Sequence, residues 1–203
     1  MNKNIFPVTD KKSERQVREI KLNQRAIVVW MTGLSGAGKT TLALGLSGEL
    51  TSKGFITKVL DGDDIRTGIN NDLGFSDTDR FENIRRVAEV SKLFLDCGII
   101  CISSFISPTN EIRKMVRNII GTDNYFEVYV NAPIEVCESR DVKGLYKKAR
   151  RGEIKHFTGI DSPFIVPDNP SIVINTDAQS VEESIKKLAE TLIPIISYES
   201  NLK

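Results

Sequence analysis

What the sequence has little of excludes several classes of protein. Three of its 203 residues are cysteine, without CxxC spacing, and one is histidine, so neither a disulfide framework nor a zinc centre is expected. No stretch approaches the roughly 18 apolar residues of a membrane span, and the first residues lack the apolar core of a secretion signal. We therefore expect a reduced, cytoplasmic protein that has no membrane partner.

An excess of charge of one sign is also missing. The sequence has 28 lysines and arginines against 27 aspartates and glutamates, which gives a net charge of +1. Such a chain has no general attraction to nucleic acid or anionic lipid. Local groups must therefore bind any anionic ligand.

Apolar runs alternate with helical patterns along the chain. Runs suited to buried parallel strands cover residues 26–32, 55–60, 99–103, 125–130 and 171–175. Helical spacing or composition predicts helices at about 39–53, 79–96, 108–120, 133–140 and 181–195, with a short helix inside 64–79. This order predicts an α/β fold with a mostly parallel central sheet and helices on both faces. We predict one domain over 26–203, preceded by a polar arm or short helix over 1–25.

A glycine-rich turn follows the first predicted strand. The segment GLSGAGKT, residues 33–40, matches the phosphate-binding pattern G-x-x-x-x-G-K-[ST] and predicts the three-layer P-loop NTPase fold. Glycines allow the backbone to approach phosphate closely, and the amides that open the next helix attract anions. We expect Lys39 to bridge the β- and γ-phosphates of ATP and Thr40 to ligate Mg²⁺. The predicted nucleotide-binding residues are Gly33, Leu34, Ser35, Gly36, Ala37, Gly38, Lys39, Thr40 and Thr41.

Two carboxylates follow the second predicted strand. Asp61 and Asp63 are two residues apart, so in an extended segment both side chains point to one side. Ligands of open α/β sheets bind at this edge, beyond the carboxyl ends of the strands. We predict that Asp63 is the general base and part of the Mg²⁺ shell, with Asp61 in support. An ordinary Asp-Gly-Asp turn is the alternative.

Arginines and an aromatic residue come next. Arg80 and Asn83 lie about one helical turn apart and are predicted to share a face opposite the apolar stripe through Phe81 and Ala88. Guanidinium groups match the geometry of phosphate and sulfate, and Phe75 can stack on a base. The alternative is a charged helix exterior with Phe75 in the core.

A second basic stretch lies further along the chain. Residues 141–155 contain six lysines and arginines and are interrupted by Gly144 and Gly152. The pattern is typical of a mobile lid, here about 141–160, that closes over phosphates. A solvated basic helix is the alternative.

Taken together, these segments resemble the adenylyl-sulfate kinase family. The matching segments are GLSGAGKTT (33–41), LDGDDIR (60–66), NNDLGFS (70–76), DRFENIRR (79–86), SSFISP (103–108), residues 127–164, which include KGLYKKAR and FTGIDSP, and PDNPSIVINT (167–176). The resemblance extends over about residues 26–195. It implies transfer of phosphate from MgATP to the ribose 3′-hydroxyl of adenylyl sulfate, by a free-standing enzyme that forms a homodimer.

The resemblance also implies residue roles. Positions that match the acceptor site of the family are Arg66, Phe75, Arg80, Asn83 and Ile106, with Lys143 and Phe157 from the lid. Ser107 matches a serine described in this family as a phosphoserine intermediate. Direct in-line transfer needs no such intermediate, and Ser107 next to Pro108 equally suits a helix cap.

Three other functions fit parts of the sequence. Another small-molecule P-loop kinase, for a nucleoside monophosphate or a sugar, would share the cradle but not DLGFS with FTGIDSP. A GTPase needs an Asn-Lys-x-Asp motif, which residues 175–177 do not provide. A catalytically inactive nucleotide-binding module is disfavoured by the intact Lys39, Thr40, Asp61 and Asp63.

Overall fold

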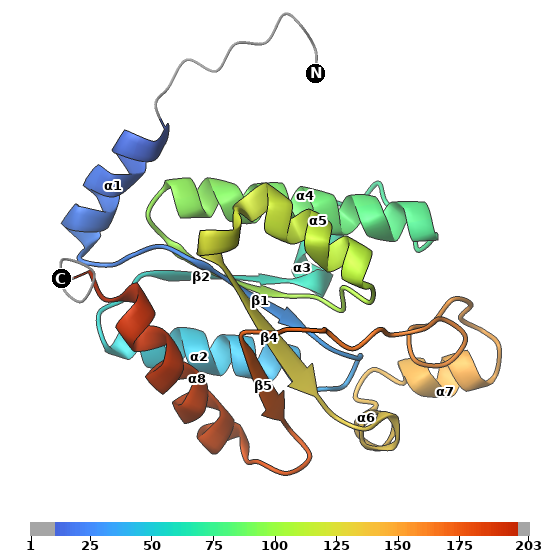
Figure 1. Ribbon diagram of the computed structural model, residues 1–203. Coiled ribbons are helices and arrows are strands. Elements are labelled where there is room, and N and C mark those ends of the chain that lie inside the picture. The colour runs from blue at the N-terminus through green and yellow to red at the C-terminus, as the bar shows by residue number, and fades with distance from the viewer. Residues whose placement is uncertain (1–10, 199–203) are drawn as a thin grey trace, which may run out of the picture.

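Five parallel strands form the central sheet, in the order β2-β3-β1-β4-β5 (Figure 1). The computed structural model describes residues 11–198, and side chains from residue 14 onward. The strands are β1 (Val28–Thr32), β2 (Thr57–Asp61), β3 (Ile100–Ser104), β4 (Tyr125–Asn131) and β5 (Ile172–Asn175). All four strand pairings within residues 11–198 are parallel. The predicted α/β fold is confirmed, and each predicted strand is present.

Helices cover both faces of this sheet. On one face lie α2 (Lys39–Ser52) and α8 (Val181–Ile196), and on the other lie α4 (Asp77–Asp96) and α5 (Asn110–Ile120) (Figure 1). Shorter elements join the strands: α3 (Gly62–Thr67), the 3₁₀ turn η1 (Thr122–Asn124), α6 (Ile134–Arg140) and α7 (Leu145–Arg150). None of the helices within residues 11–198 combines the length and apolar character that a bilayer crossing requires.

The sheet separates two apolar cores. Along β1, Val29 and Met31 point into the core beneath α2 and α8, whereas Val28 and Trp30 point into the core beneath α4 and α5. Every residue of β1 and β3 is buried, because these strands lie inside the sheet and helices cover both of their faces. This double burial explains why the continuous apolar runs predicted strands correctly.

The segment before β1 is attached to the domain. Helix α1 (Lys11–Leu22) places the Arg15 guanidinium 2.7 Å from the carbonyl oxygen of Ala26 and the Arg18 guanidinium 2.8 Å from that of Asp96. Gln24 is fully buried, and its amide nitrogen donates to the carbonyl of Gly98 at 2.8 Å. Of the predicted arm, residues 1–10 lie outside the described part of the chain.

Two details of burial differ from the sequence-based expectation. The apolar side of α4 runs through Ile84, Val87 and Ala88 and includes Asn83, which is 4% exposed, whereas Phe81 is 37% exposed. The prediction that Asn83 lies opposite the apolar stripe was therefore wrong. Phe81 lies in the second turn of α4 and is not among the residues that form the core beneath α4 and α5.

Candidate functional site

The turn between β1 and α2 has the shape of an anion cradle. Gly33, Gly36 and Gly38 all have positive φ, at 155°, 76° and 98°. A Cβ atom on Gly33 would lie 2.3 Å from the Val130 carbonyl oxygen, well inside van der Waals contact. Only glycine therefore fits at that position. The turn places the first backbone amides of α2 at the carboxyl edge of the sheet, where the helix dipole favours an anion.

Lys39 lies inside this cradle. Its side chain is buried, and Nζ donates to the carbonyl oxygens of Gly33 at 3.0 Å and Leu34 at 2.7 Å. Burial lowers the pKa of Lys39 to about 8, although the nearby Asp61 acts in the opposite direction. The two carbonyl oxygens thus hold the ammonium group inside the cradle. The negative charge of a phosphate there would favour the protonated form of Lys39.

Three side chains from distant parts of the chain hold the cradle from outside. The Tyr146 hydroxyl donates to the Ser35 carbonyl at 2.9 Å, an Arg140 guanidinium nitrogen donates to the Gly36 carbonyl at 3.2 Å, and the Thr176 hydroxyl donates to the Ala37 carbonyl at 2.8 Å. Sequence reasoning missed all three. Thr176 follows the end of β5, so the rule that ligands bind beyond strand ends could have identified it.

The two predicted carboxylates lie close to the cradle, in a geometry that differs from the prediction. Asp61 ends β2 and caps α3, accepting the amide of Asp63 at 3.0 Å, while its other oxygen accepts the Thr40 hydroxyl at 2.8 Å. Asp63 is already in the first turn of α3. The assumption of an extended Asp61–Asp63 segment was therefore wrong, because the cap starts a helix at Gly62.

Asp63 contacts the segment predicted to be a lid rather than the cradle. Its carboxylate is exposed and forms an ion pair with the Lys143 ammonium group, which lies 80 residues further along the chain. Lys143 stands between Asp141, which accepts the amides that open α7, and Gly144, which has a left-handed backbone. The predicted base and a predicted acceptor-site residue are thereby brought together.

The predicted acceptor residues form a charged and aromatic cluster around α3 and the start of α4. The Arg66 guanidinium lies 4.4 Å from the centroid of the Phe75 ring, which is 66% exposed. Arg80 donates to the Phe75 carbonyl at 2.9 Å and approaches the Thr158 hydroxyl at 3.4 Å. Burial, followed by the charge of Arg80, lowers the pKa of Arg66. Two neighbouring cations beside an exposed ring suit an anion attached to a base.

The other predicted acceptor residues are more deeply placed. Asn83 is buried and contacts Asn70. The Ile106 carbonyl accepts the Thr32 hydroxyl at 2.6 Å, at the start of the loop after β3. Phe157 is 8% exposed and packs edge-on against Tyr146, with 4.9 Å between ring centroids. Its ring thus belongs to the apolar core that includes Tyr146, and only Phe75 presents an open aromatic face within this group.

Ser107 is buried and has a structural partner. Its hydroxyl accepts the Trp30 indole N–H at 3.0 Å, and it is 1% exposed. Its backbone φ is +46°, and its carbonyl accepts Arg113 at 2.8 Å. The helix that follows is capped by Thr109, so the alternative of Ser107 as a helix cap was wrong.

The oxygen atoms near the cradle suit Mg²⁺. Thr40, Asp61 and Asp63 supply one hydroxyl and two carboxylates at one edge of the sheet. Mg²⁺ prefers oxygen ligands and typically takes one or two from protein, with phosphates and waters completing its octahedron. Within residues 11–198, no group of three or more His, Cys, Asp and Glu side chains forms a metal cage. These donors therefore fit an ion that is carried mainly by the nucleotide.

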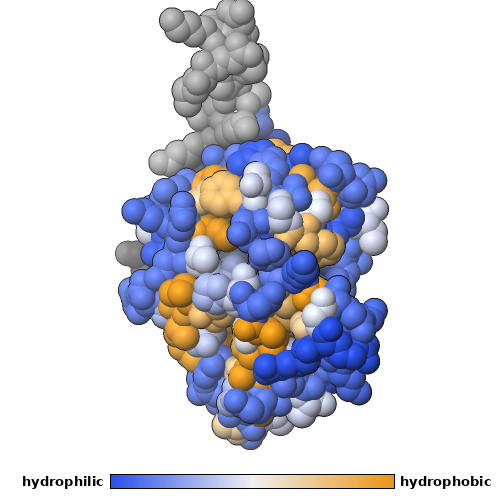
Figure 2. All heavy atoms as spheres, turned by 90° about the vertical axis from the view of Figure 1, so that its right-hand side faces the viewer, coloured by the Kyte–Doolittle hydropathy of each residue, from blue (hydrophilic) through white to orange (hydrophobic). Residues whose placement is uncertain are grey.

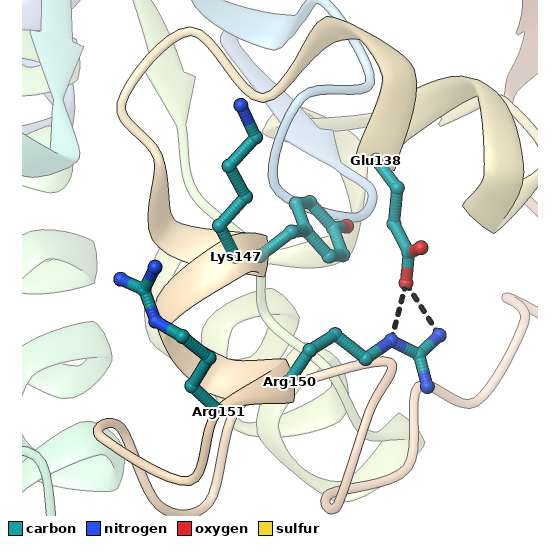
Figure 3. Close-up of a pocket in the computed structure, with 5 residues that line it drawn as sticks. Glu138, Lys147, Arg150 and Arg151 are labelled. Atoms are coloured by element: carbon teal, nitrogen blue, oxygen red, sulfur yellow. Dashed lines mark hydrogen bonds and ion pairs between the residues drawn. The ribbon is translucent and has the colours of Figure 1, made fainter.

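Two hollows flank the cradle. One, of about 320 Å³, lies beside α7, with Arg150 paired to Glu138 at 3.0 Å and Lys147 and Arg151 around it (Figure 3). The other, of about 580 Å³, has both polar and apolar lining and includes Leu34 of the cradle and Phe164. Neither is lined by Arg66, Phe75 or Arg80. Figure 2 shows the side of the molecule that lies to the right in Figure 1, where apolar and strongly hydrophilic surfaces are side by side. A ligand that carries both a base and charged groups can contact surfaces of both kinds.

Comparisons with known proteins agree with this geometry. The model of the adenylylsulphate kinase family matches residues 25–175. Adenylyl-sulfate kinases of Bacteroides fragilis and Bacteroides thetaiotaomicron are 55% and 56% identical to this chain; the alignments cover 97% of both chains for the first, and 95% of this chain and 96% of the relative for the second. An APS kinase structure from Mycobacterium tuberculosis, in complex with AMPPNP and APS, has a TM-score of 0.79 and 46% identity, over 83% of this chain and 98% of that one. The chain therefore belongs to the adenylyl-sulfate kinase family.

Proposed function

We propose that this chain transfers the γ-phosphate of ATP to the ribose 3′-hydroxyl of adenylyl sulfate, forming 3′-phosphoadenylyl sulfate and ADP. The observation that carries this proposal is the position of the Arg66–Phe75–Arg80 cluster, directly after the carboxylates that adjoin the phosphate cradle. A donor site and an anion-and-base site thereby open onto one edge of the sheet. Family membership over most of the chain supports the same reaction.

The cradle binds the donor. Amides at the start of α2 meet the phosphate oxygens, and Lys39 exchanges its two carbonyl partners for the β- and γ-phosphates. Because Lys39 is buried, its charge acts in a medium where it is screened less than in water. It stabilises the charge on the transferring phosphoryl group as the bond between the γ-phosphorus and the bridging oxygen breaks.

Asp63 is the base in this proposal. It accepts the proton of the 3′-hydroxyl as that oxygen bonds to the γ-phosphorus, and ADP leaves with the bridging oxygen. For this step Lys143 must leave Asp63 and turn to the negative charges of the acceptor. Asp61 stays in place, since it holds both Thr40 and the start of α3.

The acceptor cluster orients adenylyl sulfate. Phe75 offers its open ring to the adenine, while Arg66 and Arg80 bind the phosphosulfate group. Asn83, Ile106 and Phe157 complete the deeper wall, and Lys143 approaches from the lid. Positioning of this kind supplies most of the catalysis in phosphoryl transfer.

Magnesium would be held by Thr40, with Asp63 and Asp61 in its water shell. The ion would neutralise charge on the β- and γ-phosphates. The protein oxygens determine where the nucleotide phosphates rest relative to Asp63.

Direct transfer to the acceptor, without a phosphoserine, is also part of the proposal. The Ser107 hydroxyl is buried and accepts the Trp30 N–H, so an in-line attack from it would require the loop after β3 to move.

Assembly and location are the last parts of the proposal: a homodimer in the cytoplasm, where ATP is available. Light scattering of the purified protein would test its assembly.

A coupled ADP-release assay tests the function. The purified chain, with Mg²⁺ and ATP, is given adenylyl sulfate or AMP, and the product is identified by mass spectrometry. Turnover with adenylyl sulfate and a gain of one phosphate is expected, with far slower turnover for AMP, which lacks the sulfate. The Lys39→Ala variant serves as the matched control. Equal rates with AMP, or none with either acceptor, would refute the proposal.

A further inference from the structure

Two buried asparagines face each other between the turn after α3 and helix α4. Asn70, in the turn after α3, is 0% exposed, and Asn83 on α4 is 4% exposed. The Asn70 amide nitrogen lies 2.9 Å from the Asn83 side-chain oxygen and 3.3 Å from the Asn83 backbone carbonyl oxygen. One NH₂ group therefore contacts both acceptors of the same residue.

This double contact fixes how the Asn83 amide is turned. A backbone carbonyl can only accept a hydrogen bond, so the Asn70 atom facing it must be the NH₂ group. The nearest atom of the Asn83 side chain must then be its oxygen, since two NH₂ groups would repel each other. The NH₂ group of Asn83 consequently points away from Asn70.

That NH₂ group is available to a ligand. It donates to no other group among the described residues, although the side chain is more than nine-tenths buried. Although the side chain as a whole is buried, this nitrogen is not among the buried polar atoms that lack a partner, so it reaches the surface, where a ligand or water can accept its hydrogen bonds. We propose that Asn70 is a positioning residue for the acceptor: it holds the Asn83 amide so that its NH₂ group, and not its oxygen, faces the anionic substrate. The inference rests on the proposed function.

The bonds of Asn70 itself support this role. Its backbone amide donates to Ile65 at 3.0 Å and its carbonyl accepts Leu73 at 3.1 Å, and the Arg66 guanidinium donates to the Gly74 carbonyl at 2.8 Å, so the turn has hydrogen bonds of its own. The Asn70 side-chain oxygen is buried without any partner within residues 11–198. The side chain thus has the two contacts with Asn83 as its hydrogen bonds, and these contacts join the turn to α4 and orient the Asn83 amide.

The test is a double-mutant cycle. Asn70→Asp has nearly the same shape, but an ionised carboxylate cannot donate, so the Asn83 amide is expected to reverse and present its oxygen. The Michaelis constants for adenylyl sulfate and for ATP are measured for the wild type, Asn70→Asp, Asn83→Ala and the double variant. In the wild-type background the KM for adenylyl sulfate should rise about ten- to a hundredfold, which corresponds to the binding free energy of one hydrogen bond to a charged group. The KM for ATP should stay within about twofold.

The Asn83→Ala background separates positioning from other causes. There Asn70→Asp should change the KM for adenylyl sulfate by less than about threefold, because the amide it would reverse is gone. A direct effect of the new negative charge, or a merely structural loss, would give the same rise in both backgrounds and would overturn the inference. So would an unchanged KM in the wild-type background.

Two further controls complete the design. Asn70→Ala, which removes the donor without adding charge, is carried through the same cycle with the same expected pattern, and it decides the question if Asn70→Asp does not fold. The wild type is assayed first with adenylyl sulfate. Absence of turnover there refutes the proposed function, whereas normal turnover with no coupling between the two asparagines refutes the role of Asn70 alone.

Discussion

Removing the carboxylate of Glu127 should destabilise the protein strongly. Glu127 lies on β4 and is 4% exposed; its Oε1 is 3.5 Å from the Arg113 guanidinium and accepts the Tyr125 hydroxyl at 3.1 Å. Arg113 is also 4% exposed, and its other contacts are uncharged, including the carbonyls of Ser107 and Ile165 at 2.8 Å each. Glu127→Ala therefore leaves a buried cation without its ion-pair partner.

The expected loss follows from that burial. Removing one partner of a buried ion pair typically costs about 3–5 kcal/mol. For a domain of this size each 1 kcal/mol lowers the melting temperature by about 2–4 °C, so Glu127→Ala should lower it by about 6–20 °C. Urea denaturation gives the free energy of unfolding directly, provided that its slope with denaturant is unchanged.

Arg117→Ala is the matched control. Arg117 contacts the same carboxylate at 3.2 Å, but its side chain is 39% exposed. Exposed pairs contribute about 0–1 kcal/mol, so this variant should stay close to the wild type. The reasoning is refuted if Glu127→Ala costs no more than Arg117→Ala. The double variant Arg113→Met, Glu127→Leu should recover part of the loss, because it removes the stranded charge.

Four other outcomes are expected. Lys39→Ala should lower kcat by at least about 10²–10³-fold, because the charge that stabilises the transferring phosphoryl group is lost. The melting temperature should not fall, because the same substitution removes a buried charge. Ser107→Ala should keep kcat within tenfold of the wild type while unfolding costs about 1–3 kcal/mol less, because the Trp30 N–H loses its acceptor. Arg80→Ala should raise the KM for adenylyl sulfate about ten- to a hundredfold, with an unchanged KM for ATP. Finally, because burial lowers the pKa of Lys39 to about 8, the lysine is charged below that pH and neutral above it; ATP affinity, measured by titration calorimetry, should be level below pH 7 and fall above pH 8.

Local pattern predicted the fold well. The apolar run over 26–32 contains β1 (Val28–Thr32), and the glycine pattern placed the cradle between that strand and α2 (Lys39–Ser52). Both signals depend on short-range physics: burial on two faces of a sheet, and backbone conformations that only glycine adopts readily. Element ends differed by a few residues, because capping groups such as Thr109 decide them.

The candidate site was harder to predict at the end of a strand, where Asp61 ends β2 and Asp63 already belongs to α3. The spacing of Asp61 and Asp63 was interpreted as extended, but Asp61 caps a helix, so the two carboxylates have different partners. Asn83 was placed on the polar side of α4 because it lies about one helical turn from Arg80. Its buried side chain instead contacts Asn70, in a turn that has no regular period to reveal the contact.

The site residues that the sequence did not predict contact the cradle from distant segments, and they determine how the peptide groups of the cradle are oriented. Tyr146 and Thr176 reach the Ser35 and Ala37 carbonyls across 111 and 139 residues. In a trans peptide the carbonyl and the following N–H point in opposite directions. Donors outside the loop that hold these two carbonyls therefore turn the N–H groups of Gly36 and Gly38 toward the phosphate side. The glycine motif gives the loop its freedom to curl, but the choice of which peptide groups face the anion is made by side chains outside the motif, which no pattern within residues 33–40 can contain.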